Sequence, residues 1–202
     1  SDCEIILHLY KLYGLEYTLH LLDGVFAFII YDKLKATFII ARDPYGVRPL
    51  YYYTDSNQYG FASELKSIYK FPHRKKLIQN FLPGNYMILN NLNSKITCYL
   101  NKYHSFPYTN NLNQTFDNQL SREIYNTFSN AIKKRVISTT DRPIGCLLSG
   151  GLDSSIVAAF VNYYINQNNT TNISKQIETF SIGLPGSEDL KYAKIVAKHL
   201  NS

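Results

Sequence analysis

The chain opens with apolar residues spaced as on one face of a helix. That face is formed by Ile5, Leu9 and Leu12. Asp2 is a candidate N-cap, and Gly14 stands where such a helix would end. The spacing therefore predicts a helix over residues 2–13.

Beyond Gly24 the pattern changes to apolar, aromatic and β-branched runs that are separated by polar breaks. The predicted strands cover residues 25–31, 37–41, 50–53, 59–62, 85–89 and 95–100. The breaks at 32–35 and 90–94 predict hairpins, because Asn, Asp and Ser favour turns. Residues 1–100 are thus predicted to be mainly antiparallel sheet with a little helix.

A second pattern begins after residues 101–115, which are polar, rich in Asn and broken by Pro107, and which we interpret as a linker. One face of the next predicted helix, capped by Asp117, is marked by Leu120, Ile124, Phe128 and Ala131. Strands are predicted at 144–148 and 177–183, a helix at 154–164, and a last helix by the spacing of Leu190, Ala193, Val196 and Leu200. This order predicts a right-handed crossover and a parallel sheet, so residues 116–202 form an α/β domain.

The strand at 144–148 is followed directly by Ser-Gly-Gly-Leu-Asp-Ser-Ser, residues 149–155. Glycines allow positive φ and close backbone approach, and backbone N–H groups ahead of a helix bind phosphates. Ser154 and Ser155 add hydroxyl donors, and Asp153 beside phosphates makes chemical sense if Mg²⁺ lies between them. The alternative is a structural Gly-Gly turn in which Asp153 is only a helix N-cap.

Several stretches together resemble one known family. The loop at 149–155 resembles the PP-loop of the ATP pyrophosphatases, and residues 179–184 and 187–190 are similar to the next strand and helix of glutamine-dependent asparagine synthetases. That family's glutaminase domain is matched in order by residues 1–4, 22–28, 42–51 and 62–66. The resemblance implies an α+β antiparallel-sheet glutaminase part at 1–100 and an α/β parallel-sheet PP-loop part, like an adenine nucleotide α-hydrolase, at 116–202.

The family's activity implies three substrates, glutamine, aspartate and ATP, and the cofactor Mg²⁺. Aspartate and ATP would form β-aspartyl-AMP with release of pyrophosphate, and ammonia from glutamine would then displace AMP to give asparagine. The residues implied in ATP binding are Leu148, Ser149, Gly150, Gly151, Leu152, Asp153, Ser154, Ser155 and Ile182. Ile182 would contact adenine from its strand, Leu148 would meet the nucleotide through its backbone, and Asp153 would serve Mg-pyrophosphate.

On the glutaminase side, the resemblance assigns Asp2 to the α-amino group of glutamine, while its position alone favours a helix cap. The family's nucleophile is an N-terminal cysteine. Cys3 is not that residue, so we expect a fragment that is inactive alone and a nucleophile upstream of Ser1. Two alternatives stay open: another PP-loop amidotransferase, such as a β-lactam synthetase, or a non-catalytic nucleotide-binding descendant.

The net charge of +6 includes basic runs at 73–76 and 133–135. Both are short, so we interpret them as solvated faces and predict no nucleic-acid partner. No apolar stretch approaches the ~18 residues of a membrane span, so no membrane partner is predicted, and a homodimer is left open. The three cysteines form no Cys-x-x-Cys pair, which favours reduced thiols and a cytoplasmic protein.

Some residues favour structural interpretations over chemical ones. We expect Cys3 to be a partly buried helical thiol and Cys146 to be a small core residue. Arg42 and Asp43 are expected to form a structural ion pair or an interdomain contact. The tyrosines at 51–53 are explained by alternating burial along a strand.

Overall fold

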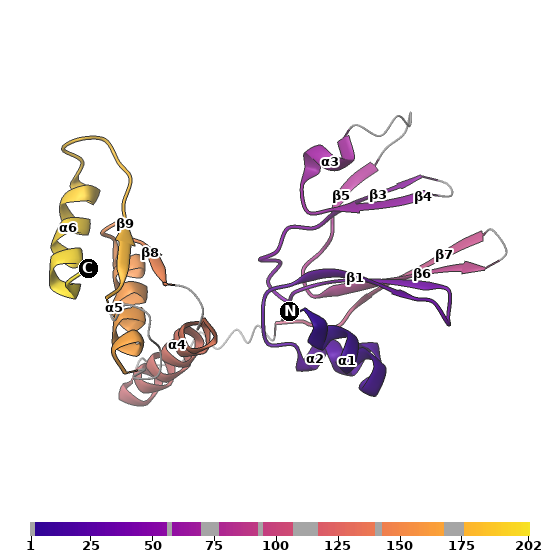
Figure 1. Cartoon of the computed structure of the whole chain (residues 1–202), viewed down its shortest axis with the longest axis horizontal. Helices are drawn as coiled ribbons and strands as arrows, with labels where there is room; N and C mark the ends of the chain where they lie inside the picture. Colours follow the sequence, from indigo (N-terminus) through magenta and orange to yellow (C-terminus); the bar gives the residue numbers. More distant parts are fainter. Residues whose placement is uncertain are drawn as a thin grey trace. The chain divides into compact units, whose positions relative to one another are not determined.

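The computed structural model describes residues 3–55, 58–69, 77–92, 95–106, 117–139, 143–167 and 176–202. The chain divides into two compact units, Ser1–Asn110 and Asn111–Ser202 (Figure 1). The sequence-based domain boundaries at 100 and 115 stay a prediction. Asp2, the basic run at 73–76 and most of the expected linker lie outside the described residues.

Unit 1 contains two antiparallel sheets. The first has the order β1-β2-β6-β7, formed by Ala27–Asp32, Thr37–Arg42, Asn85–Leu92 and Lys95–Lys102. The second has the order β4-β3-β5, formed by Gln58–Ala62, Tyr51–Asp55 and Leu77–Asn80. The hairpins predicted around 32–35 and 90–94 are confirmed as β1–β2 and β6–β7. β5 was not predicted, because four residues with two adjacent apolar positions carry no clear alternation.

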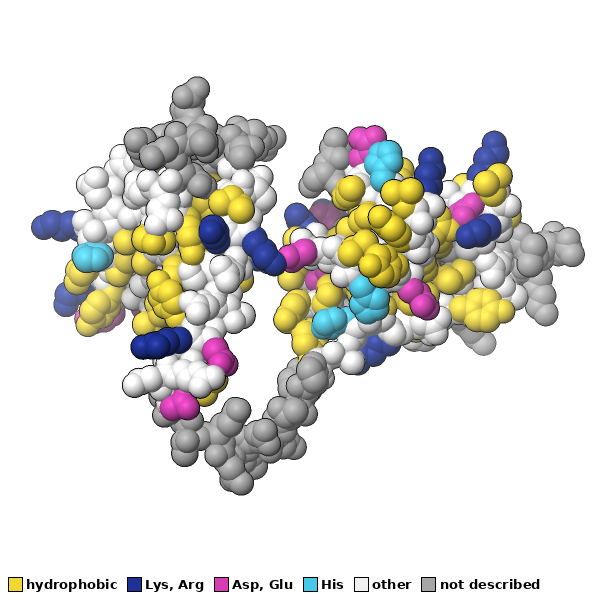
Figure 2. Space-filling view, turned by 90° about the horizontal axis from the view of Figure 1, so that it is seen from below, with side chains coloured by type: hydrophobic (Ala, Val, Ile, Leu, Met, Phe, Trp, Pro, Cys, Tyr) yellow, Lys and Arg dark blue, Asp and Glu magenta, His cyan; other side chains and the backbone are white. Residues whose placement is uncertain are grey.

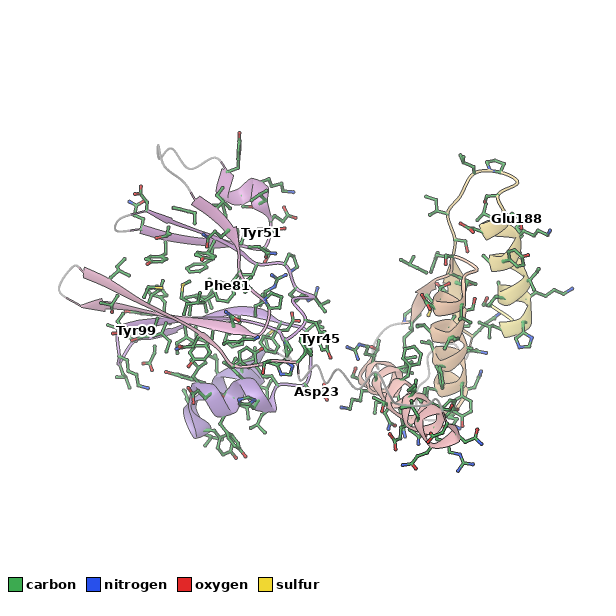
Figure 3. All side chains as sticks on the ribbon, turned by 180° about the vertical axis from the view of Figure 1, so that it is seen from behind. Asp23, Tyr45, Tyr51, Phe81, Tyr99 and Glu188 are labelled. Atoms are coloured by element: carbon green, nitrogen blue, oxygen red, sulfur yellow. The ribbon has the colours of Figure 1, made fainter. Side chains whose placement is uncertain are left out.

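The layers of unit 1 follow from the two faces of the first sheet (Figure 1). One face packs against the second sheet, and the buried residues between them are Ile40, Leu50, Phe81, Met87 and Leu89. Figure 3 shows Phe81 between the two sheets. The other face is covered by helices, with Leu19, Ala41 and Tyr86 buried there. Burial of apolar area in these layers supplies the main stabilisation of the unit.

Helix α1, Glu4–Tyr13, ends at Gly14 with φ of +76°, as predicted. It begins two residues later than predicted, after Cys3, which is exposed rather than partly buried. Two helices were not predicted: α2, Leu15–Leu21, and α3, Leu65–Tyr69. α1 buries no residue within unit 1, and hydrophobic side chains gather over α1 and α2 in Figure 2.

Unit 2 contains α4 (Asn118–Ser138), β8 (Gly145–Leu147), α5 (Leu152–Gln167), β9 (Glu178–Phe180) and α6 (Glu188–Leu200). β8 and β9 are parallel neighbours joined through α5, which confirms the predicted strand–helix–strand arrangement. Both strands have three residues, so they are shorter than predicted. No helix in the described ranges is both long and apolar enough to span a membrane.

The buried face of α4 differs from the prediction. Asp117 caps this helix as expected, since its carboxylate accepts from the Leu120 N–H at 2.7 Å. Ile124 and Phe128, however, are 54% and 40% exposed. The residues buried instead are Ser129, Ile132 and Val136. The helix is thus rotated from the expected face, because Ile132 and Val136 join the core around the buried Cys146.

The first residues of the predicted linker belong to unit 1. β7 continues to Lys102, and the Tyr103 N–H donates to the Gly84 carbonyl at 2.9 Å. The Tyr103 hydroxyl donates to the Arg42 carbonyl at 2.8 Å. β7 thus extends two residues beyond the strand end predicted at residue 100, and Tyr103, directly after it, is bonded to the same unit.

Candidate nucleotide-binding site

The turn between β8 and α5 needs glycine at residue 150. Gly150 has φ of +85°, in the left-handed region that side chains disfavour. A Cβ at this position would lie 2.6 Å from both the Ala193 nitrogen and the Asp189 oxygen. The loop therefore rests directly on the backbone of α6.

Serine hydroxyls hold the loop in shape. The Ser154 Oγ accepts from the Ser149 N–H at 3.2 Å, and the Oγ atoms of these two serines are 2.9 Å apart. The Gly151 N–H donates to the Ser149 Oγ at 3.3 Å. The Ser155 Oγ donates to the Gly151 carbonyl at 2.7 Å, which anchors the first turn of α5. The motif thus forms a turn that is closed by the hydroxyls of its own serines.

Asp153 is the second residue of α5, which begins at Leu152. The structural alternative, in which Asp153 is the N-cap, is therefore wrong, because a cap residue precedes the helix. The side chain is exposed, and no hydrogen bond or ion pair to it is found within the described residues. A carboxylate in a first helical turn is favoured by the helix dipole, and this one stays accessible to a cation.

A hollow of about 400 Å³ opens where β8 and β9 end. It is lined by Leu147, Leu148, Ser149, Ser154, Phe180, Ser181 and Ile182. Carboxyl ends of parallel strands are where α/β sheets bind ligands, and the volume lies in the range of small-molecule sites. Four of the predicted residues meet here, and the other five lie on the adjoining turn and first helical turn.

Leu148 and Ile182 lie at the two strand ends in different ways. The Leu148 side chain is 2% exposed and belongs to the core, so only its backbone can face a ligand. Ile182 is 99% exposed and follows the end of β9, so the prediction that it lies within the strand is wrong. The expected contacts of both residues with a nucleotide stay predictions.

Sequence reasoning missed three residues of the hollow: Leu147, Phe180 and Ser181. Leu147 pairs with Phe180 across the two strands, and these side chains are 85% and 54% exposed. The Ser181 Oγ donates to the Leu148 carbonyl at 2.6 Å. Their places depend on the register between β8 and β9, which no local pattern encodes.

In unit 1, Arg42 and Asp43 are structural, although they are not an ion pair. Arg42, 6% exposed, donates to four acceptors at 2.5–2.7 Å: the carbonyls of Gly46, Arg48 and Phe81 and the Asn80 side chain. Asp43, 1% exposed, accepts from the N–H groups of Tyr45, Val47 and Arg48. Each charge is satisfied separately, so the predicted pairing is wrong and the loop at 43–48 is fixed from both sides.

Burial changes the acidity of two groups near these features. It raises the pKa of the Cys146 thiol, which suits an inert core residue. It also raises the pKa of the Tyr103 hydroxyl, with the Asp43 carboxylate adding to the effect. Both groups therefore stay protonated at neutral pH and are structural.

Comparison with known families decides which family unit 1 represents. The family described as "Glutamine amidotransferase domain" matches residues 1–126, more than half of the chain. The chain belongs to the glutamine amidotransferase domain family. Residues 123–202 match a second family, described as asparagine synthase, so the 149–155 loop lies outside the glutamine amidotransferase domain match.

Curated relatives resemble this glutamine amidotransferase domain and the segment that follows it. Asparagine synthetases (glutamine-hydrolyzing) from Gallus gallus, Mus musculus and Homo sapiens are 40%, 39% and 38% identical over the full chain. The chain spans 38% of the length of each of these relatives. A solved glutamine phosphoribosylpyrophosphate amidotransferase from B. subtilis, complexed with ADP and GMP, aligns over 95% of this chain and 43% of its own. That likeness, with a TM-score of 0.41 and 20% identity, is too weak to support an argument.

Proposed function

We propose that this chain is part of a glutamine-dependent asparagine synthetase. The enzyme would hydrolyse glutamine, pass ammonia to an ATP-dependent site, and convert aspartate to asparagine with release of AMP and pyrophosphate. The observation that carries the proposal is the succession, in one chain, of a glutamine amidotransferase match and an asparagine synthase match that contains the serine–glycine loop. The activity belongs to the whole protein, of which the chain is a part.

The second unit would act as a PP-loop site. The β8–α5 turn would present backbone N–H groups to the phosphates, and the N-terminus of α5 would add a favourable dipole. The hydroxyls of Ser149 and Ser154 bond to each other and to loop amides. On ATP binding they would exchange these hydrogen bonds for bonds to phosphate oxygens. Preorganised donors of this kind stabilise charge as pyrophosphate departs.

Asp153 is suited to hold Mg²⁺ at this site. Mg²⁺ is commonly bound by one or two carboxylates together with substrate phosphates, and an exposed carboxylate in the first turn of α5 fits that role. Within the described ranges no group of three His, Cys, Asp or Glu residues could hold a metal, so the phosphates would supply most of the ligands. When bound, the ion would neutralise charge on the departing pyrophosphate.

The partners and the setting follow from the same proposal. Glutamine, aspartate and ATP are the proposed substrates, and Asp2 is a candidate for glutamine binding. The free thiols of Cys98 and Cys146 and the exposed Cys3 accord with the cytoplasm, where thiols stay reduced.

Replacing Asp153 with asparagine in the full-length protein tests the proposal. We expect aspartate-dependent exchange of ATP with pyrophosphate to fall by ~10² or more, because one charge-stabilising contact is lost. Glutamine hydrolysis should persist, since that reaction needs no phosphate. Asp117→Asn is the matched control, because it changes the same residue type at a helix start outside the loop and keeps a capping side chain.

Unchanged exchange in Asp153→Asn would contradict the catalytic role of Asp153. The proposed function itself is tested by measuring ATP–pyrophosphate exchange in the unsubstituted full-length protein. Exchange that depends on a different carboxylic acid would support another PP-loop amidotransferase. The absence of any exchange would support a non-catalytic descendant.

A further inference from the structure

At the strand ends beside the hollow, a side-chain hydrogen bond takes the place of a backbone bond of the ladder. β8 and β9 pair with Leu147 opposite Phe180, so the next pair is Leu148 opposite Ser181. In a parallel ladder with this register, the Leu148 N–H donates to residue 180 and its carbonyl accepts from the N–H of residue 182. The first bond is present, at 2.8 Å to the Phe180 carbonyl.

The second ladder bond is replaced by a side chain. The Leu148 carbonyl accepts from the Ser181 hydroxyl at 2.6 Å, and no bond links it to the Ile182 N–H. In the described part of the chain, that N–H has no hydrogen-bond acceptor. The ladder therefore stops one residue early, at the place where the hollow opens between Ser149 and Ile182.

We propose that Ser181 is a positioning residue for the base of the nucleotide. Its hydroxyl takes the place on the Leu148 carbonyl that the Ile182 N–H would hold in the ladder, and so the two strand ends stay apart. The Ile182 N–H is then available as a donor, and the Leu148 carbonyl keeps a second lone pair as an acceptor. This inference rests on the proposed ATP-dependent function.

A donor beside an acceptor is the pattern that the edge of adenine requires. Adenine presents an amino donor next to a ring-nitrogen acceptor, whereas guanine presents the reverse order at the same positions. The phosphates would be held at the other end of the site, by the turn at 149–151. Ser181 therefore affects the affinity for the base and leaves the affinity for pyrophosphate unchanged.

Two isosteric replacements in the full-length protein isolate the hydroxyl. Ser181→Thr keeps it and Ser181→Val removes it, while both side chains have nearly the same shape. Ser181 lies at the exposed surface of the hollow, so the added methyl has room. We expect the Val variant to raise the KM for ATP about fivefold in the exchange reaction, as loss of one neutral hydrogen bond implies, with kcat within about twofold. The Thr variant should resemble the parent protein.

The KM for pyrophosphate in the same exchange separates the base from the phosphates. It should stay within about twofold in both variants, because the turn that holds phosphate is unchanged. Ser138→Ala is the matched control: it removes a hydroxyl-to-carbonyl bond, to Arg135 at 3.1 Å, elsewhere in unit 2. This variant should leave both KM values unchanged.

Equal KM values for ATP in the Val and Thr variants would overturn the role of Ser181. A parallel rise of both KM values in the Val variant would also overturn it, because the loop as a whole would then have moved. If the parent protein shows no aspartate-dependent exchange, the proposed function fails instead. Exchange measured in the parent protein thus distinguishes failure of the Ser181 role from failure of the proposed function.

Discussion

Arg42→Lys tests whether the buried guanidinium holds unit 1 together through its shape or through its charge. The substitution keeps the positive charge and removes the planar fork. Arg42 is 6% exposed and donates at 2.5–2.7 Å to four acceptors, which lie in the 43–48 loop and in the segment at residues 80 and 81. A single ammonium cannot reach all four, so two or three acceptors would lose their donor.

The expected loss follows from those bonds. A net contribution of ~1 kcal/mol for each lost bond gives about 2–3 kcal/mol in the free energy of unfolding. For a unit of about 100 residues, 1 kcal/mol corresponds to a shift of roughly 4–8 °C in the melting temperature. We therefore expect the transition of unit 1 to move down by about 8–15 °C, allowing for partial rescue by water.

Scanning calorimetry of the full-length protein, with glutamine hydrolysis followed after heating, would measure this shift. Arg48→Lys is the matched control, because Arg48 lies in the same loop with an exposed side chain, and only its backbone carbonyl bonds to Arg42. A shift in Arg42→Lys no larger than in this control would refute the reasoning. It would show that charge alone, rather than the directed bonds, satisfies the site.

Two further predictions concern Gly150 and Tyr103. Gly150→Ala should lower the free energy of unfolding of unit 2 by ~2 kcal/mol or more and reduce exchange, because it adds a clash with α6 to the strain of positive φ. Gly186 has φ of +84° and nothing lies within 4 Å of the added Cβ, so Gly186→Ala should show only the loss from backbone strain. Equal losses in the free energy of unfolding for the two variants, measured by urea unfolding, would exclude the clash. Burial raises the pKa of Tyr103 above its ordinary 10.0, so its contribution to stability is complete below pH 10 and is lost as pH rises further. The melting temperature should therefore fall less steeply with pH above 10 in Tyr103→Phe than in the parent or in Tyr99→Phe, whose tyrosine is exposed. Identical pH dependence of the melting temperature in all three proteins would contradict this.

Much of the fold could be predicted because the strands are continuous apolar and β-branched runs separated by polar breaks. The hairpins around 32–35 and 90–94 follow from uninterrupted apolar runs between polar turns. α2, α3 and β5 have seven, five and four residues, too few to establish a period. Tertiary packing decides their structure.

The loop could be predicted because its residue types are fixed by local backbone chemistry. Gly150 does require positive φ, and the serines at 149 and 154 do close the turn. The face of α4 could not be predicted, because more than one apolar line runs along it and only the core selects between them. Ser181 was missed for a similar reason, since its partner lies 33 residues earlier in the chain.

The contact of Gly150 with the backbone of α6 has a consequence for protein engineering. The seven-residue motif cannot be moved by itself, since Gly150 packs directly on the backbone of the helix that begins at Glu188. Grafting residues 149–155 onto another strand–helix junction would transfer the sequence without the α6 backbone on which Gly150 packs. A successful transplant would have to carry the whole segment from β8 to the end of α6.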